Sequence, residues 1–124
     1  MPRFVILRHE MPPGRARASH WDFMLEQGDH LSTWALAVEP SAGCESPAEK
    51  LPDHRRHYLD YEGPVSNDRG TVTRWDQGTY RLVSASDDGW VVELSGERLI
   101  GRATLNRQHD HFWIVAFSAV STAG

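Results

Sequence analysis

Three side chains near the N-terminus, His9, His20 and Asp22, are of the types that bind transition-metal ions. His20 and Asp22 are two residues apart, so on a β-strand they share one face, while Trp21 and Phe23 occupy the other and can point into a core. If a strand that ends at His9 pairs with a strand that begins at His20, two imidazoles and one carboxylate meet. Such a set suits Mn²⁺, Zn²⁺ or Fe²⁺, with water or a substrate at the open positions. The same spacing also suits plain polar surface, and spacing alone leaves both interpretations open.

The segment LPDHRRHYLDYEG, residues 51–63, holds a second group of chemically useful side chains. If the segment is helical, His54 and Tyr58 are four residues apart and share a face. A histidine and a tyrosine presented together can bind a phosphate or transfer a proton. The alternative is a capped helical turn whose tyrosines anchor it to the rest of the fold. A further pair, His109 and His111, lies at an expected hairpin tip, where we expect plain surface.

The elements that must position these side chains are short strands, expected at residues 3–9, 20–26, 30–38, 71–75, 79–83, 89–94, 98–105 and 112–117. Glycine-containing tripeptides at 27–29 and 76–78 separate neighbouring strands and are typical of hairpins. Eight such strands favour an all-β fold, a closed or nearly closed antiparallel barrel or a sandwich. Helical signal is weak. We expect one or two turns through residues 54–61, capped by Asp53, and a surface loop over residues 39–51.

Composition limits the classes of protein to which the chain can belong. Its 124 residues suffice for one domain, expected over residues 1–124, and 40% apolar with 24% charged residues is typical of globular proteins. A formal net charge of −4 argues against a broad basic nucleic-acid-binding face, although a bound metal ion would add charge outside that count. No apolar run approaches the roughly 20 residues of a membrane-spanning helix. Cys44 is the only cysteine, and no signal peptide is evident, so we expect a cytoplasmic protein.

Six sequence blocks follow one another between about residues 3 and 117: RFVILRHE, HWDFMLE, STWALAVEPS, DHRRHYLDYEG, RGTVTRWDQGTY and VVELSGERLIGRATLNR. Each block is only moderately specific, but six in one order are hard to obtain by chance. In order and internal spacing they resemble the 3′-phosphoesterase domain that is found at the N-terminus of bacterial DNA ligase D and as stand-alone proteins.

The resemblance implies a compact β-barrel with a polar groove and a Mn²⁺-dependent hydrolase, with Zn²⁺, Co²⁺ or Fe²⁺ as alternative ions. The implied activity removes a 3′-terminal ribonucleoside and then the 3′-phosphate from DNA or RNA primer–template ends. This leaves a 3′-hydroxyl for repair by non-homologous end joining. By position, His9, His20 and Asp22 match the family's metal ligands. His54 matches a histidine that contacts the scissile phosphate, and Tyr58 matches a tyrosine needed for activity. A separate end-joining ligase or polymerase is the implied partner, with no membrane; we expect a monomer.

The chain departs from the family pattern at several positions. Met24 stands where the family has an arginine, and Val38 where it has a lysine. Methionine cannot donate a hydrogen bond to a phosphate, so one charge-assisted contact is absent. The loop between His9 and His20 is about five residues longer than in the ligase-linked domains. Four arginines could supply the lost positive charge from new positions: Arg15, Arg17, Arg55 and Arg56.

These departures leave two alternatives to a phosphoesterase. The first is a catalytically weakened module that binds nucleic-acid 3′ ends through its metal, which the methionine at position 24 favours. The second is a metal-dependent hydrolase of a small phosphate ester. The presence of both His54 and Tyr58 favours catalysis, because a binding module has less use for that pair.

Overall fold

Strands make up most of the described part of the chain. The computed structural model describes residues 1–15 and 17–119, and its helical structure is the single 3₁₀ turn η1 (Arg56–Leu59). The strands are β1 (Arg3–Glu10), β2 (His20–Gln27), β3 (His30–Leu36), β4 (Glu45–Arg55), β5 (Gly63–Pro64), β6 (Thr71–Ala85), β7 (Gly89–Gly96), β8 (Ile100–His109) and β9 (Phe112–Ala119). None of the helical structure in the described residues has the length and apolar character of a membrane span.

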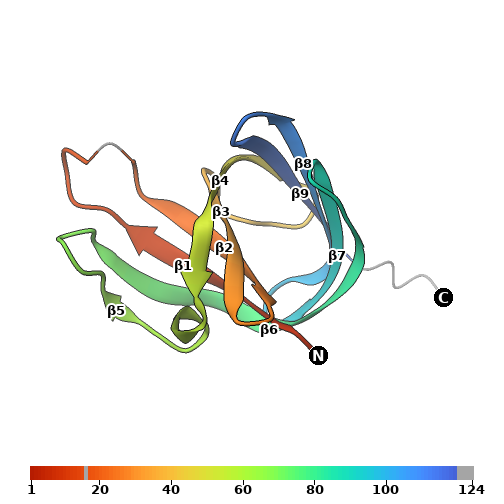
Figure 1. Cartoon of the computed structure of the whole chain (residues 1–124), viewed down its shortest axis with the longest axis horizontal. Coiled ribbons are helices and arrows are strands. Elements are labelled where there is room, and N and C mark those ends of the chain that lie inside the picture. Colours follow the sequence, from red (N-terminus) through yellow and green to blue (C-terminus); the bar gives the residue numbers. More distant parts are fainter. Residues whose placement is uncertain (16, 120–124) are drawn as a thin grey trace.

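The strands close into one antiparallel barrel (Figure 1). Hydrogen-bonded neighbours follow the order β1-β2-β3-β4-β9-β8-β7-β6, and the pairing of β6 with β1 completes the ring of eight strands. The two-residue β5 adds to β6 through pairing of Gly63 with Val72. The prediction of an all-β, eight-stranded antiparallel barrel is therefore confirmed.

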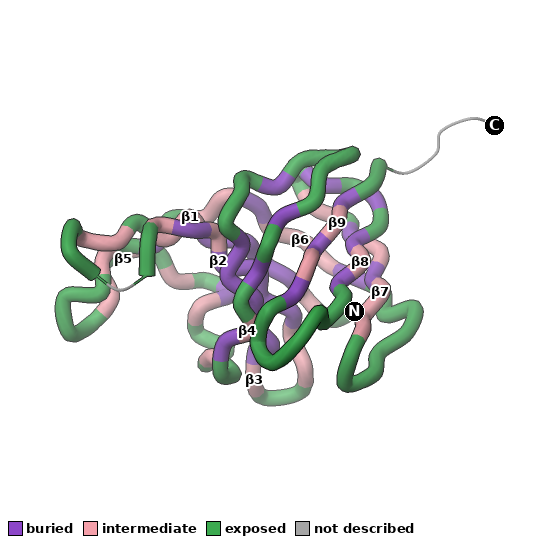
Figure 2. The backbone as a smooth tube through the Cα atoms, turned by 90° about the horizontal axis from the view of Figure 1, so that it is seen from above, coloured by how far each residue is buried: buried purple, intermediate pink, exposed green. Residues whose placement is uncertain are grey.

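Alternate side chains of the strands fill the barrel interior. The interior cluster comprises Phe4, Ile6, Phe23, Leu25, Trp34, Leu36, Ala48, Tyr80, Val92, Leu94, Leu99, Ala103, Leu105, Trp113, Val115 and Phe117. Trp34 packs against Phe23 and Trp113, with ring centroids 6.4 and 5.6 Å apart. Aromatic pairs of this kind add about 0.5–1.5 kcal/mol beyond simple area burial. In Figure 2 the buried positions are concentrated in the barrel strands, and the connecting loops are exposed.

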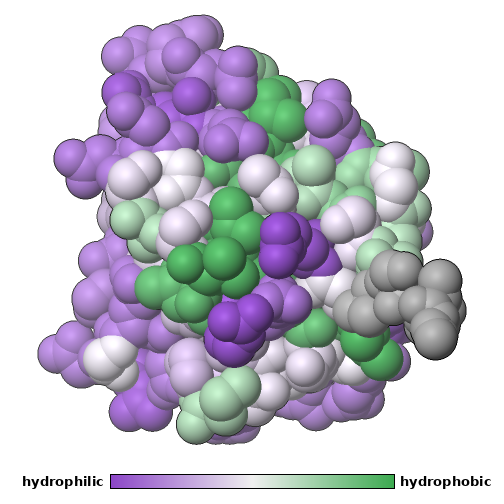
Figure 3. All heavy atoms as spheres, turned by 90° about the vertical axis from the view of Figure 1, so that its right-hand side faces the viewer, coloured by the Kyte–Doolittle hydropathy of each residue, from purple (hydrophilic) through white to green (hydrophobic). Residues whose placement is uncertain are grey.

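A second, smaller apolar cluster lies on the outer side of the barrel wall. It comprises Val5, Leu7, Met24, Leu31, Leu59 and Val72. The η1 turn and the following segment cover it, since Tyr58, Tyr61 and Val65 pack against it. The strands β1 and β2 are therefore buried on both faces, which explains why their sequences are so apolar. Figure 3 shows a face of the molecule on which a hydrophobic patch is bordered by hydrophilic side chains.

The expected hairpin at residues 76–78 is wrong, because β6 runs without interruption through these residues. The Asp76 carboxylate is buried and accepts hydrogen bonds at 2.9 Å from the backbone N–H groups of residues 97–99, so it holds the β7–β8 turn. A side chain at Gly78 would place its Cβ only 2.0 Å from the carbonyl oxygen of Ser95. The glycine is there for close strand approach and makes no turn.

The expected loop over residues 39–51 is also wrong in its second half, where β4 begins at Glu45. This strand pairs with β3 and β9, yet its outer positions are the exposed Glu45, Pro47 and Glu49, so it lacks an apolar signature. The expected helical turn is shorter than the 54–61 range, and Asp53 does not cap it. Asp53 and His54 belong to β4, and the N-cap residue is Arg55, with no side-chain capping hydrogen bond.

Candidate metal centre and active site

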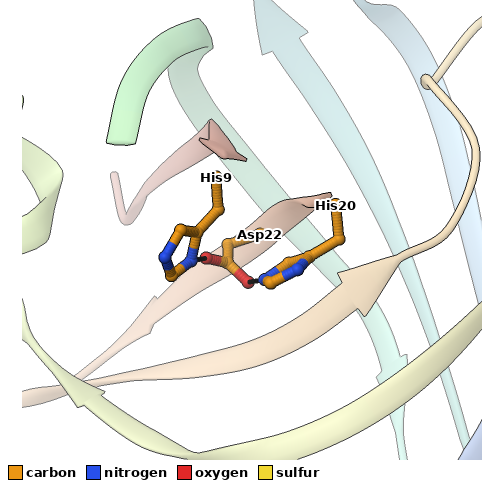
Figure 4. A group of neighbouring side chains, drawn as sticks. All are labelled: His9, His20 and Asp22. Atoms are coloured by element: carbon orange, nitrogen blue, oxygen red, sulfur yellow. Dashed lines mark hydrogen bonds and ion pairs between the residues drawn. The ribbon is translucent and has the colours of Figure 1, made fainter. Parts of the chain in front are cut away.

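The pairing of β1 with β2 brings the three expected metal ligands together. His9 and His20 are direct cross-strand partners, and Asp22 is paired with Leu7 one step along the same outer face. His9 Nδ1 lies 3.0 Å from Asp22 Oδ2, and His20 Nε2 lies 3.0 Å from Asp22 Oδ1 (Figure 4). One ligand atom from each residue falls within 4.8 Å of the others. Neighbouring ligands of an octahedral ion at about 2.1 Å lie about 3 Å apart, so the spacing fits a metal ion.

Backbone carbonyls fix the orientation of both imidazoles. His9 Nε2 lies 2.6 Å from the carbonyl oxygen of Arg69, and His20 Nδ1 lies 2.8 Å from that of Ala18. A carbonyl oxygen only accepts, so the nitrogen facing it carries a proton. This arrangement leaves His9 Nδ1 and His20 Nε2 directed at Asp22 as the possible ligand atoms. Metal-binding histidines are commonly oriented by such contacts at the opposite ring nitrogen.

Asp22 is a buried carboxylate that lacks part of its hydrogen bonding. Its side chain is only 3% exposed, and Oδ1 accepts no hydrogen bond from any residue that the structure describes. Burial raises the pKa of Asp22, but the approach of His20 and His9 outweighs this and lowers the pKa to about 2. For His9, burial lowers the pKa. Its contacts with Asp22 and the Arg69 carbonyl more than offset this effect, so the pKa of His9 is raised overall. The pocket thus stabilises a cation beside a charged carboxylate.

The β5–β6 loop, residues 65–70, positions His9. Gly70 has φ +83°, and a Cβ there would lie 1.8 Å from the Glu10 carbonyl oxygen. Only glycine therefore allows the loop to lie directly against the end of β1, and this contact places the Arg69 carbonyl on the His9 ring. Because backbone atoms make this contact, no side-chain type in the sequence indicates it.

His54 and Tyr58 open onto the same cavity as the three metal-ligand candidates. This cavity, of about 410 Å³, is lined by His9, Met11, Arg17, His20, Asp22, Met24, Leu51, Pro52, Asp53, His54, Arg55, Tyr58, Val65, Arg69 and Val72. The His54 and Tyr58 rings lie 5.7 Å apart between centroids. His54 Nδ1 lies 2.9 Å from the Pro52 carbonyl oxygen, which leaves Nε2 as the free nitrogen. The end of β4 and the η1 turn, and not one continuous helix, bring the pair together.

The four arginines proposed from the sequence are placed differently. Arg17 and Arg55 line the cavity, and Arg17 also makes a two-point contact with Glu49 at 3.2 and 3.0 Å. Arg15 instead binds the carbonyl oxygens of the β5–β6 loop and does not line the cavity. Arg56 is not brought to the cavity either, because Glu26 binds its guanidinium, with Nε to Oε2 at 2.9 Å.

Arg69, Met24 and the pair His109 and His111 complete the comparison with the sequence. Arg69 lines the cavity, although the sequence did not single out this residue, which begins the block RGTVTRWDQGTY. Its only signal is the following glycine. Met24 is 1% exposed and forms part of an apolar floor, where the resemblance implies an arginine. The pair His109 and His111 is exposed around the β8–β9 tip, as expected.

Comparison with known proteins assigns this architecture to a family. The model of the "DNA Ligase D 3′-phosphoesterase domain" matches residues 13–107. The chain belongs to this family. The matched range contains four of the five candidate residues, namely His20, Asp22, His54 and Tyr58, whereas His9 precedes it.

The curated relatives of this chain are much longer proteins. The chain is 32% identical over 120 residues to the "Multifunctional non-homologous end joining protein LigD" of Mycobacterium bovis, and equally to the corresponding DNA repair protein of Mycobacterium tuberculosis. It is 30% identical over 118 residues to the LigD of Pseudomonas aeruginosa. These matches cover 90, 90 and 85% of this chain, which spans only 15, 15 and 13% of the relatives' lengths.

Proposed function

We propose that this domain is a metal-dependent 3′-phosphoesterase that trims a 3′-terminal ribonucleoside or 3′-phosphate from DNA or RNA ends, leaving a 3′-hydroxyl. The observation that carries the proposal is the pair of atoms Asp22 Oδ1 and His20 Nε2. They lie 3.0 Å apart, buried, and the oxygen has no hydrogen bond from the described residues. A buried carboxylate oxygen without a hydrogen bond, next to an imidazole nitrogen, is a donor set that a bound cation would satisfy. The cavity that contains them also holds His54 and Tyr58.

The proposed ion is Mn²⁺, with Zn²⁺, Co²⁺ or Fe²⁺ as alternatives that this donor set accepts. His9 Nδ1, His20 Nε2 and the Asp22 carboxylate would hold it. When bound, the ion supplies Lewis-acid polarisation of a non-bridging phosphate oxygen. The Arg69 and Ala18 carbonyls keep both imidazoles in the tautomers that this binding needs.

His54 and Tyr58 have separate proposed roles at the phosphate. The Nε2 atom of His54 is free, because Nδ1 is turned to the Pro52 carbonyl. When His54 is protonated, its Nε2–H group would donate a proton to the leaving oxygen. The Tyr58 hydroxyl would donate a hydrogen bond that orients the phosphate. The ribose 2′-hydroxyl next to a phosphodiester is a candidate internal nucleophile for the removal of a terminal ribonucleoside.

Positive charge at the phosphate would come from loops in this domain. Arg17, Arg55 and Arg69 line the cavity, while position 24 offers only an apolar side chain. Arginine binds phosphate oxygens through two parallel N–H donors, so relocation of this charge can preserve the contact. We leave Arg15 and Arg56 out of the proposed phosphate contacts, because neither side chain lines the cavity.

The proposed cellular role is end joining during DNA repair. The curated relatives are named as multifunctional end-joining proteins, and we extend this role to the chain, with a separate ligase or polymerase as partner. A monomer in the cytoplasm fits this proposal. The second candidate function is a metal-dependent 3′-end-binding module. It is favoured by the apolar Met24 and by the Glu49 carboxylate that neutralises Arg17.

The test is product analysis of a primer–template that ends in one ribonucleotide or in a 3′-phosphate, incubated with Mn²⁺ or with a chelator. We expect Mn²⁺-dependent conversion to a 3′-hydroxyl end. If the protein binds Mn²⁺ and the 3′-phosphate end but converts neither substrate, the binding-module function replaces the phosphoesterase. Hydrolysis confined to mononucleotides or sugar phosphates would instead point to a small phosphate ester as the substrate.

A further inference from the structure

A second hollow adjoins the candidate metal centre, and the chemistry proposed above does not use it. It has a volume of about 320 Å³ and shares Arg17 and His20 with the metal-centre cavity. Small side chains, including Ala35 and Pro47, line it, and the ring of Phe112 borders it. We call this hollow the Phe112 shelf. Arg17 and His20 border both spaces, so a molecule bound in the metal-centre cavity lies beside the shelf.

Strand register places the Phe112 shelf and the metal centre on the same outer face of the barrel. Asp22 pairs with Ala35, Ala35 with Glu49, and Glu49 with Phe112. Directly paired residues on neighbouring strands project from the same side of a sheet. Three strand spacings of about 4.8 Å put the Phe112 backbone about 14 Å from that of Asp22. Its side chain can therefore contact a group attached to a phosphate at the metal centre.

Phe112 is unusual among the aromatic side chains of this protein. The phenylalanines at positions 4, 23 and 117 are at most 4% exposed, whereas Phe112 is 39% exposed. Its ring packs at 5.4 Å and 32° against His109 at the β8–β9 tip. This contact supports one side of the ring and leaves part of it open to solvent. An exposed, supported aromatic ring is the feature on which proteins stack nucleic-acid bases.

The Phe112 shelf combines one positively charged side chain with a mainly small or apolar lining, which suits the phosphate and the base of a nucleotide. The positively charged group of the shelf is Arg17, which is shared with the metal-centre cavity; the remaining lining is small or apolar apart from Ser19, His20 and Glu49. A phosphate would therefore be held on the metal-centre side, and a base on the apolar side. Stacking of a base on an aromatic ring depends little on which base it is, so the shelf would bind all four bases similarly.

We propose that the Phe112 shelf binds a base from one of the last two nucleosides of the strand whose 3′-phosphate lies at the metal centre. The inference rests on the proposed function, because it takes the phosphate to be bound at the metal. The shelf would make the domain select an oligonucleotide end over an isolated phosphate ester, without preference for sequence. The last base of a duplex keeps one face free, so a primer end can be bound in this way as well as a single strand.

The experiment measures binding of a dye-labelled, single-stranded 3′-phosphorylated oligonucleotide by fluorescence anisotropy. It uses Mn²⁺-loaded protein in a His54→Ala background, which keeps the metal-ligand candidates. We expect Phe112→Ala to weaken binding about tenfold and Phe112→Trp to preserve it, because stacking depends on the ring. The matched control is Ile100→Ala, which removes an exposed apolar side chain at the opposite end of β8 and should leave Kd unchanged.

An oligonucleotide with abasic sites at its last two positions tests the base directly. It should bind the Phe112-containing protein about tenfold more weakly than the normal strand, and Phe112→Ala should abolish this difference. Equal Kd values for Phe112 and Phe112→Ala proteins would overturn the inference, as would an unchanged abasic penalty. Failure of the proposed function has a different signature, namely absence of Mn²⁺-dependent trimming by the protein with His54 intact.

Discussion

The side chains on the two faces of strand β2 are held in place by different interactions. Toward the barrel interior, Phe23 and Leu25 join a large apolar cluster in which packing alone determines the side-chain positions. Toward the outside, His20 and Asp22 are equally buried but polar, and their positions depend on hydrogen bonds and ion pairs from neighbouring segments. The comparison indicates that this barrel separates stability from chemistry across a single sheet. Substitutions on the two faces should therefore fail in different ways.

The largest effect on stability is expected inside the barrel. Trp34→Ala should lower the free energy of unfolding by about 3–5 kcal/mol, because it leaves a cavity among Phe23, Trp90 and Trp113. Chemical denaturation followed by circular dichroism measures this change. The exposed Leu82 is the control, and Leu82→Ala should cost no more than about 0.5 kcal/mol. Similar losses for both variants would mean that the interior cluster does not dominate stability.

On the outer face, Asp22→Asn should abolish metal binding without unfolding the barrel. The carboxylate lies between both imidazoles, and the neutral amide cannot replace its charge toward a divalent cation. Isothermal titration with Mn²⁺ should show affinity reduced by more than about 100-fold, and Mn²⁺ should no longer raise the melting temperature. Asp29→Asn, at an exposed turn, serves as the control and should keep the parent affinity.

The loop that supports His9 should matter to a smaller extent. Gly70→Ala forces the loop away from β1, because the new Cβ would lie 1.8 Å from the Glu10 carbonyl oxygen. Loss of the carbonyl contact to His9 should weaken Mn²⁺ binding about 10- to 100-fold. Gly43 has a nearly identical φ of +84° but open space around it, so Gly43→Ala carries the same backbone strain without the clash. Equal Mn²⁺ affinities in the two variants would refute a positioning role for the loop.

The smallest expected effect is a difference in kcat/KM between substitutions of two arginines. Arg69→Ala should lower kcat/KM on a 3′-phosphorylated DNA end about tenfold while Mn²⁺ affinity stays the same, because the backbone carbonyl that orients His9 remains. Arg56→Ala should change kcat/KM less than twofold, since Glu26 holds that side chain outside the cavity. A larger loss for Arg56 than for Arg69 would reverse the assignment.

The fold was predictable where one side of a strand is apolar, and unpredictable where backbone contacts decide. The runs around Phe4, Phe23 and Val115 identify β1, β2 and β9 from sequence. By contrast, β4 has exposed outer positions without an apolar signature, and β6 contains a glycine that is typical of a turn but serves close strand approach. Local periodicity does not contain either piece of information.

The candidate site, too, was predictable from side-chain patterns but not where backbone contacts decide. The two-residue spacing of His20 and Asp22 predicts a shared face, and strand pairing adds His9. The juxtaposition of His54 with Tyr58 was expected for a helix, yet a strand end followed by a 3₁₀ turn produces it. Arg69 could not be identified, because its contact with His9 is made by the backbone carbonyl, which every residue possesses.

Anomalous diffraction from a crystal of the protein grown with Mn²⁺ is the most direct test of the central claim. The account predicts one strong manganese peak within about 2.3 Å of His9 Nδ1, His20 Nε2 and an Asp22 oxygen. It also predicts that the Arg69 and Ala18 carbonyls still contact the opposite ring nitrogens. A manganese peak elsewhere on the protein, with His9 and His20 still bound only to Asp22, would contradict the assignment of this outer face as the metal centre.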